Sequence, residues 1–193
     1  MNNFITDRDF AFTILKKYTK NESLIKHALT IEAVMRYFAK LFGENELEKW
    51  GIIGLLHDID YERYPDKHCL MVREILSPYG FPEEYLRAIE SHGYEVINDV
   101  EPVQTMEKVL YATDELTGLI AATVVLRPGK SIMDLKVSSV KKKWKQKSFA
   151  SGVNRHVIEE GARMLEMELD ILIENTIKGM QIVAEEIGLK GEL

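Results

Sequence analysis

Apolar residues recur at helical spacing along most of this chain, and that spacing constrains the fold more than any other feature. Leu24, Ile31 and Val34 share one helix face, because residues three, four and seven positions apart lie on the same side of a helix. No segment alternates apolar and polar residues between hairpin turns, as the strands of a half-buried sheet do. The sequence therefore predicts an all-α fold with additional C-terminal helices.

Capping residues and turn signals divide the chain into predicted helices. Asp7 is suited to cap the first helix, Gly43 to end the second, and Pro128-Gly129 to end the long helix after Pro102. We expect one domain over residues 1–193, with a core of about 23–121 and a basic segment and C-terminal helices over about 130–188. The predicted helices cover 7–18, 23–41, 46–58, 68–76, 82–91, 103–126, 131–136, 137–147, 154–168 and 170–187.

Composition limits the classes of protein that fit. The 193 residues are 46% hydrophobic and 29% charged, which allows a sizeable core in a soluble protein. The formal net charge of −6 argues against a general nucleic-acid binder. The chain has no apolar run that could span a bilayer and no signal-peptide pattern, and its one cysteine, Cys69, fits a reducing compartment. We therefore expect a cytoplasmic protein with no membrane partner.

A histidine and an aspartate, His57 and Asp58, are adjacent at the end of an apolar stretch, where both groups are costly to desolvate without a partner. His27 and Asp114 lie in the apolar patterns of two other predicted helices. Each residue taken alone has an ordinary structural explanation. His27 could be a hydrogen-bonded core histidine, Asp58 a carboxylate at a helix end near a lysine or arginine, and Asp114 a buried carboxylate bonded to a helix N-terminus or to an arginine. Their occurrence on three amphipathic helices instead favours one shared divalent metal, for which His and Asp are standard ligands.

This order of residues resembles the HD-domain superfamily of metal-dependent phosphohydrolases. The resemblance rests on His27, on the His-Asp pair within Leu55-Leu56-His57-Asp58-Ile59, and on Asp114, and it covers about residues 23–121. It implies an HD-domain-like helical bundle that holds one or two divalent ions and acts on phosphomonoesters or phosphodiesters, often of nucleotides. The superfamily also includes a di-iron oxygenase branch and members of unknown activity.

Two further histidines suit a second metal ion. Two-metal members of the superfamily place two additional histidines between the doublet and the last aspartate, and His68 and His92 match that order. Asp58 would then bridge the ions, since a carboxylate has two oxygens and an imidazole one free nitrogen. A structural interpretation stays open for each histidine. His68 could be an exposed residue at a helix start, and His92 a histidine at a helix C-terminus that the helix dipole stabilises. Such ligands suit Mn²⁺, Fe²⁺, Co²⁺, Ni²⁺ or Zn²⁺, and Mg²⁺ is also open.

The general base cannot be assigned from the sequence. Some single-metal nucleotidases of the superfamily carry a glutamate three residues after the aspartate of the doublet. Here that position is Tyr61, and the glutamate follows at Glu62. We expect Asp60 and Glu62 to be solvated loop carboxylates rather than catalytic groups.

A basic run, Lys141-Lys142-Lys143-Trp144-Lys145-Gln146-Lys147, concentrates positive charge in an otherwise acidic chain, and Arg155 follows it. Because a phosphate substrate needs cations, we expect this segment to border the cleft and Lys143, Lys147 or Arg155 to contact a substrate phosphate. A solvated helix face is the alternative.

Together these features predict a metal-dependent phosphohydrolase, either a phosphomonoesterase or a phosphodiesterase. Its substrate would be a small phosphate ester, with nucleotides included, attacked by a metal-activated water. A di-iron oxygenase on the same scaffold and a non-catalytic nucleotide- or metal-binding protein are the alternatives. The apolar stripe of the last predicted helix packs on the core or on a second copy of the chain, so a homo-oligomer also stays open.

Overall fold

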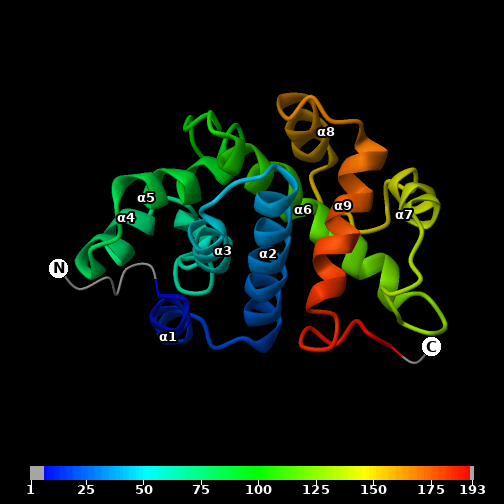
Figure 1. Cartoon of the computed structure of the whole chain (residues 1–193), viewed down its shortest axis with the longest axis horizontal. Helices are drawn as coiled ribbons and strands as arrows, with labels where there is room; N and C mark the ends of the chain where they lie inside the picture. The colour runs from blue at the N-terminus through cyan, green and yellow to red at the C-terminus, as the bar shows by residue number, and fades with distance from the viewer. Residues whose placement is uncertain (1–6, 192–193) are drawn as a thin grey trace.

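Nine α-helices and no β-strand are found in residues 7–191, the part of the chain that the computed structural model describes (Figure 1). The all-α prediction is confirmed. No helix among these residues has the length and apolar character needed to cross a membrane. The α-helices are α1 (Arg8–Tyr18), α2 (Glu22–Leu41), α3 (Leu47–Leu56), α4 (Val72–Leu76), α5 (Glu83–Glu90), α6 (Thr105–Val125), α7 (Val137–Trp144), α8 (Arg155–Met164) and α9 (Leu169–Ile182), and short 3₁₀ turns are η2 (Pro65–Lys67), η3 (Ser77–Tyr79) and η4 (Ser91–Gly93).

The middle of the bundle is α2, which packs against α3, α6 and α9 (Figure 1). Its apolar face is fully buried at Ile31, Val34 and Phe38, as the helical spacing predicts. One hydrophobic cluster extends from α1 to α9 and includes Leu172 and Met180 of the last helix. The apolar stripe of α9 therefore packs on the core of the same chain.

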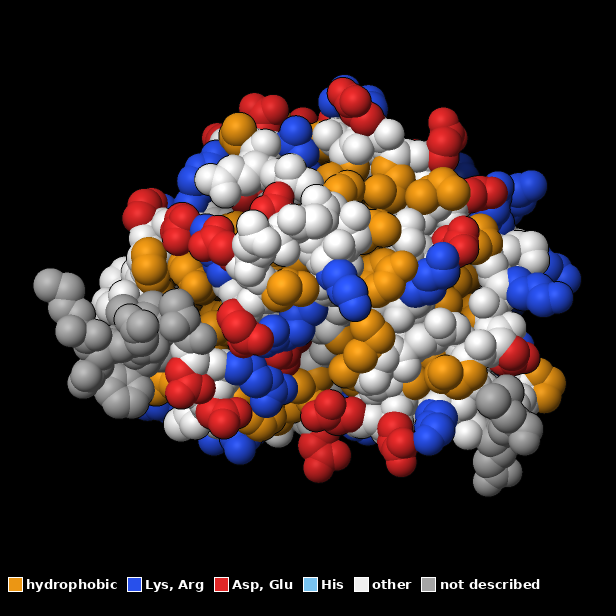
Figure 2. All heavy atoms as spheres, in the orientation of Figure 1, with side chains coloured by type: hydrophobic (Ala, Val, Ile, Leu, Met, Phe, Trp, Pro, Cys, Tyr) orange, Lys and Arg blue, Asp and Glu red, His pale blue; other side chains and the backbone are white. Residues whose placement is uncertain are grey.

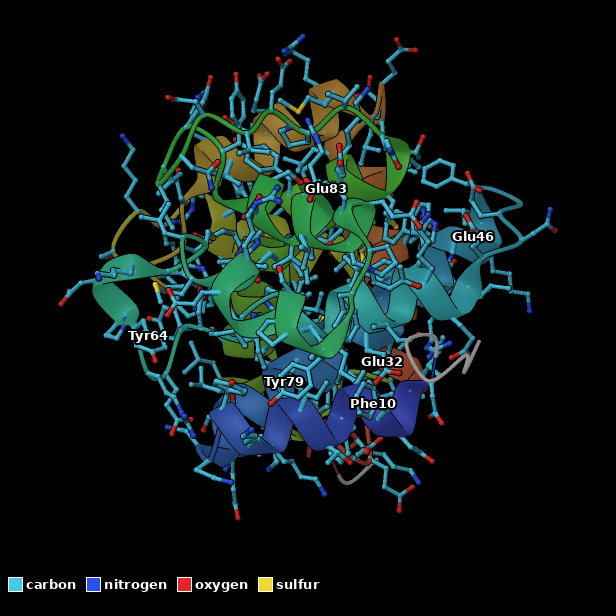
Figure 3. All side chains as sticks on the ribbon, turned by 90° about the vertical axis from the view of Figure 1, so that its left-hand side faces the viewer. Phe10, Glu32, Glu46, Tyr64, Tyr79 and Glu83 are labelled. Carbon is cyan, nitrogen blue, oxygen red and sulfur yellow. The ribbon has the colours of Figure 1, made fainter. Side chains whose placement is uncertain are left out.

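Helix α1 is capped by its own N-terminal residue and held against the rest of the bundle by two contacts, one from Arg8 and one from Phe10. Asp7 caps the helix, because its carboxylate accepts hydrogen bonds from the backbone N–H groups of its first turn. The Arg8 guanidinium donates two 2.9 Å hydrogen bonds to the Glu32 carboxylate of α2. On the other side Phe10 lies edge-on to Tyr79, with 6.2 Å between ring centroids (Figure 3).

The loop after α3 is tied to the start of α2, and this tie brings two parts of the site together. Glu62 accepts hydrogen bonds from the backbone N–H groups of Lys20, at 2.8 Å, and Asn21, at 2.9 Å. Asn21 in turn caps α2 through the N–H of Ser23. Glu62 is exposed, as predicted, and it stabilises the N-terminus of the helix that carries His27.

The helices predicted over 137–147, 154–168 and 170–187 end three to five residues earlier, at Trp144, Met164 and Ile182. Two other predicted segments differ in the backbone conformation itself. Residues 131–136 form turns, because the backbone of Ile132 bonds to distant partners: its N–H donates to Leu189 O at 2.8 Å, and its carbonyl accepts from Gln181 Nε2. Residues 68–71 are also a turn, and α4 begins only at Val72. The cause is Cys69, whose left-handed φ of 62° is incompatible with a right-handed helix.

Candidate metal centre

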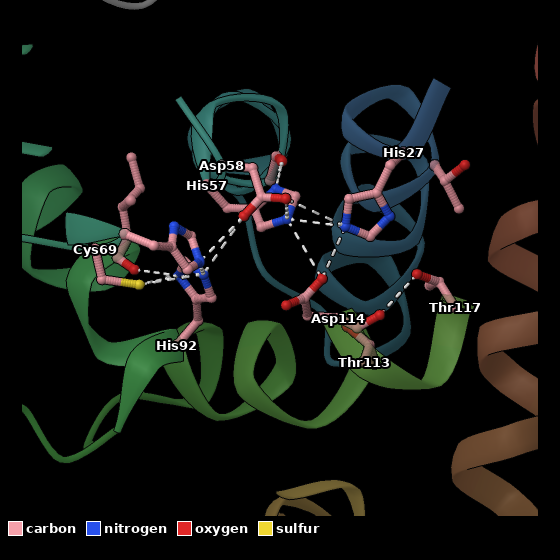
Figure 4. Close-up of polar contacts among 12 residues, drawn as sticks. His27, His57, Asp58, Cys69, His92, Thr113, Asp114 and Thr117 are labelled. Carbon is pink, nitrogen blue, oxygen red and sulfur yellow. Dashed lines mark hydrogen bonds and ion pairs between the residues drawn. The ribbon is translucent and has the colours of Figure 1, made fainter. Parts of the chain in front are cut away.

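Six polar side chains from five parts of the chain meet at one place (Figure 4). Five of them line a cavity of about 350 Å³, and His57, at the end of α3, is fully buried next to them. The predicted ligands are thus brought together by the fold. The five are His27 of α2, Asp58 after α3, His68 before α4, His92 of η4 and Asp114 of α6.

The first group of ligand atoms surrounds His57 Nε2. This nitrogen lies 3.1 Å from His27 Nε2, 3.3 Å from Asp114 Oδ1 and 3.4 Å from Asp58 Oδ2. His27 Nε2 is also 2.9 Å from Asp114 Oδ1. Two nitrogens and two carboxylate oxygens from three helices or helix ends therefore face one point.

The second group forms on the other oxygen of Asp58. Oδ1 of this carboxylate lies 3.4 Å from His68 Nε2 and 3.7 Å from His92 Nε2. The two imidazole nitrogens are 3.1 Å apart. Asp58 therefore stands between two groups of nitrogens and presents one oxygen to each (Figure 4).

Hydrogen bonds on the far side of each ring aim the free nitrogens inward. His57 Nδ1 donates to the Gly54 carbonyl at 2.8 Å, and His92 Nδ1 donates to the Ile89 carbonyl. His68 Nδ1 donates to Asp60 Oδ1 at 2.9 Å. In the neutral rings the lone pair is thus on Nε2, so His68 and His92 direct lone pairs at each other. This arrangement requires a proton or a metal cation between them.

The expectation that Asp60 is a solvated loop carboxylate is wrong. This side chain is fully buried, because the turn before α4 folds back over it. Its Oδ1 accepts from His68 and its Oδ2 accepts from the backbone N–H of Met71 at 3.2 Å. Asp60 therefore orients His68, as carboxylates beside metal-ligating histidines commonly do.

The charges of the first group support one another. Burial opposes a positive His57, but the carboxylates of Asp58 and Asp114 outweigh it and raise the pKa of His57 well above its ordinary value. Burial opposes the ionised carboxylates as well, yet His57 lowers the pKa of both Asp58 and Asp114. Both carboxylates are thus charged at neutral pH and available as ligands.

The two histidines of the second group have pKa values shifted in opposite directions. Burial, assisted by the neighbouring His68, lowers the pKa of His92 to about 4. Burial also opposes charge on His68, but its hydrogen bond to Asp60 and the nearby Asp58 raise its pKa. His92 is therefore neutral at pH 7, the form in which an imidazole binds a metal.

The spacing of these atoms fits divalent cations. Two ligand atoms that each lie about 2.1 Å from one ion are about 3.0 Å apart at a right angle and about 3.4 Å apart at a tetrahedral angle. Within the two groups, the distances from each imidazole nitrogen to the other ligand atoms run from 2.9 to 3.7 Å. The two histidines and two carboxylates of the first group, and the two histidines and shared carboxylate of the second, therefore suit one ion each.

The basic segment does not bring its predicted phosphate ligands to this cavity. Arg155 donates to the backbone carbonyls of Trp144, at 3.1 Å, and Phe149, at 2.7 Å, and so holds together the turns after α7. Lys143 lies over the Phe149 ring, and Lys147 is exposed. In Figure 2 basic side chains gather at the right-hand end, over α7. A substrate contact by these three residues stays a prediction, and the contacts of Arg155 argue against it.

Only part of the remaining cavity wall was anticipated from the sequence. Leu24 lies one helical turn before His27, on the face that periodicity predicts. Glu115 directly follows Asp114 on α6, and periodicity gave no signal for it. Val96 and Ile97 come from the irregular segment after η4, which carries no periodic signal. Part of the cavity wall is thus built by a loop.

Comparison with known proteins agrees with this geometry. Residues 24–119 match the family model described as HD domain, and this segment contains all six side chains of the centre. The comparison with curated proteins gave no match, and neither did the comparison with solved structures. The chain therefore belongs, through residues 24–119, to the HD-domain superfamily of metal-dependent phosphohydrolases.

Proposed function

We propose that this protein is a metal-dependent phosphohydrolase that cleaves a small phosphate ester at a two-ion centre. One observation carries the proposal: Asp58 presents one carboxylate oxygen to each of two groups of imidazole nitrogens. A single-ion site would need only the first group. Without a second ion, the second group would need a proton between the facing nitrogens of His68 and His92.

The chemistry follows from the ligands. Divalent ions bound by such groups polarise a phosphoryl oxygen and lower the pKa of a water molecule, so that a nucleophile is available at neutral pH. Nitrogen and carboxylate ligands favour Mn²⁺, Fe²⁺, Co²⁺, Ni²⁺ or Zn²⁺ over Ca²⁺.

The surrounding residues hold these ligands in place. The carbonyls of Gly54 and Ile89 fix the rings of His57 and His92, and Asp60 fixes His68. A ligand set held in this way loses little conformational freedom when an ion binds. Because Asp58 lines the cavity, a phosphate group in the cavity can lie next to the ligand that both groups share.

The proposal is tested by metal analysis together with a substrate screen. We expect two ions per chain, and hydrolysis of p-nitrophenyl phosphate or bis(p-nitrophenyl) phosphate with at least one of Mn²⁺, Co²⁺, Ni²⁺ or Mg²⁺. Asp58→Asn should lose both ions, and His92→Ala should lose one. His156→Ala is the matched control, because His156 is an exposed histidine outside the cavity.

Three results would contradict the proposal. One ion per chain in the wild type would exclude the two-ion centre. Turnover that requires oxygen and an iron pair would indicate the oxygenase chemistry of the same scaffold. Tight binding of a nucleotide or metal without turnover of any phosphate ester would indicate a non-catalytic binding protein.

A further inference from the structure

The cavity at the metal centre has an apolar wall, and no lysine or arginine side chain of residues 7–191 lines it. From this we infer that the site selects esters of a single phosphate joined to an uncharged organic group, and disfavours diphosphates, triphosphates and other esters that carry further anionic groups. This inference rests on the proposed phosphohydrolase function and names its class of substrate.

The wall exposes apolar side chains at the rim of a polar centre. Val96 is 58% exposed, Tyr61 44% and Ile97 38%, and all three line the cavity. The Tyr61 ring also contacts His68, with 5.2 Å between ring centroids. An organic group attached to a metal-bound phosphate would cover this apolar surface. Ligand sites typically combine such surface with a few polar anchors.

The loop part of the wall is held in position. The backbone N–H groups of Val96, Ile97 and Asn98 all converge on the carbonyl of Gly93, at 2.8 to 3.2 Å. Asn98 Nδ2 also donates to the Glu90 carbonyl at 2.8 Å. Gly93 is packed so closely that an added Cβ would lie 2.8 Å from the sulfur of Cys69. Val96 and Ile97 are therefore presented by a fixed turn.

The charge of the cavity argues against further phosphate groups. Its lining carries three carboxylates, Asp58, Asp114 and Glu115. Two divalent ions would leave a net charge of +1 on these groups, and a phosphate monoester dianion would make it −1. Each further phosphate adds negative charge, whereas sites for polyphosphates supply lysine, arginine or clustered backbone N–H groups. Arg155, which the sequence suggested as a phosphate ligand, has its guanidinium bonded to backbone carbonyls.

Binding of three phosphonates to the metal-loaded protein tests this inference without turnover. The probes are methylphosphonate, phenylphosphonate and 4-carboxyphenylphosphonate, measured by calorimetry after metal content is confirmed. Phenylphosphonate should bind about tenfold more tightly than methylphosphonate, because part of its ring leaves water against the apolar wall. The carboxylate of the third probe should abolish most of this advantage.

Two variants make the test specific to the wall. Val96→Lys places a cation at the rim and should strengthen binding of 4-carboxyphenylphosphonate relative to phenylphosphonate. Val103→Lys is the matched control, since Val103 is 62% exposed and lies outside the cavity lining, and it should leave all three affinities unchanged.

Equal affinity for the methyl and phenyl probes, or tightest binding of the carboxylated probe, would overturn the inference. Failure of all three probes to bind would overturn it as well. A different result would contradict the proposed hydrolase function and leave this inference standing. If the phosphonates bind in the expected order but no phosphate ester is hydrolysed, the apolar wall stands as a ligand site and the hydrolase assignment does not.

Discussion

Asp60→Asn is the substitution that best tests how the second group of ligands is built. The two oxygens of Asp60 accept from two different donors, His68 Nδ1 at 2.9 Å and the Met71 N–H at 3.2 Å. Asparagine has nearly the same volume but only one acceptor oxygen, and its amide N–H₂ group must then face one of these donors. The side chain is fully buried, so water cannot relieve the conflict.

Each orientation of the new amide has its own cost. If the N–H₂ group faces His68, the imidazole must accept at Nδ1 and carry its proton on Nε2, where it blocks metal binding. The affinity for one ion should then fall by about 10- to 100-fold, or about 1.4–2.7 kcal/mol. If the N–H₂ group faces Met71, a buried backbone N–H loses its acceptor, and the free energy of unfolding falls by about 1–3 kcal/mol.

Metal titration and thermal denaturation of the same variant separate these outcomes. The control is Asp66→Asn, because Asp66 is an exposed carboxylate in the same loop. Binding of the other ion, at His27, His57 and Asp114, should be unchanged. If Asp60→Asn keeps both the wild-type affinity for two ions and the wild-type stability, Asp60 does not orient His68 and the reasoning is refuted.

Two further predictions concern protons and packing. Burial opposes charge on His57, but the adjacent carboxylates raise its pKa well above the ordinary value, so ion binding should release a proton and strengthen as the pH rises through that pKa. Calorimetry in buffers of different ionisation enthalpy measures this proton, and affinity that is the same at pH about 6 and about 8 would contradict the prediction. Gly161→Ala should lower the free energy of unfolding by about 1–3 kcal/mol, because its Cβ would lie 2.5 Å from Ala112 Cα of α6. In thermal denaturation Gly152→Ala, which has nothing within 4 Å, should match the wild type, and equal loss in both variants would rule out helix contact as the cause.

The helices and the order of the candidate ligands could be predicted from the amino-acid sequence alone. The period of apolar residues identifies a helix and the face that it buries, so α2 and α6 are found close to their predicted bounds. The same period places His27 and Asp114 on the buried sides of these helices. A polar residue on such a face needs a partner, and the presence of several of them already indicated a shared site.

Only the tertiary structure decided how those residues meet. Periodicity does not say which helices become neighbours. The bridging position of Asp58 was expected from its two oxygens and from the resemblance, but only packing brings the two groups of histidines to it. Loop residues have no period at all. The left-handed turn at Cys69 buries Asp60 against His68, and the turn at Gly93 carries Val96 to the cavity. These positions depend on backbone conformations and close contacts that form only when distant segments pack together, and local sequence preferences do not specify them.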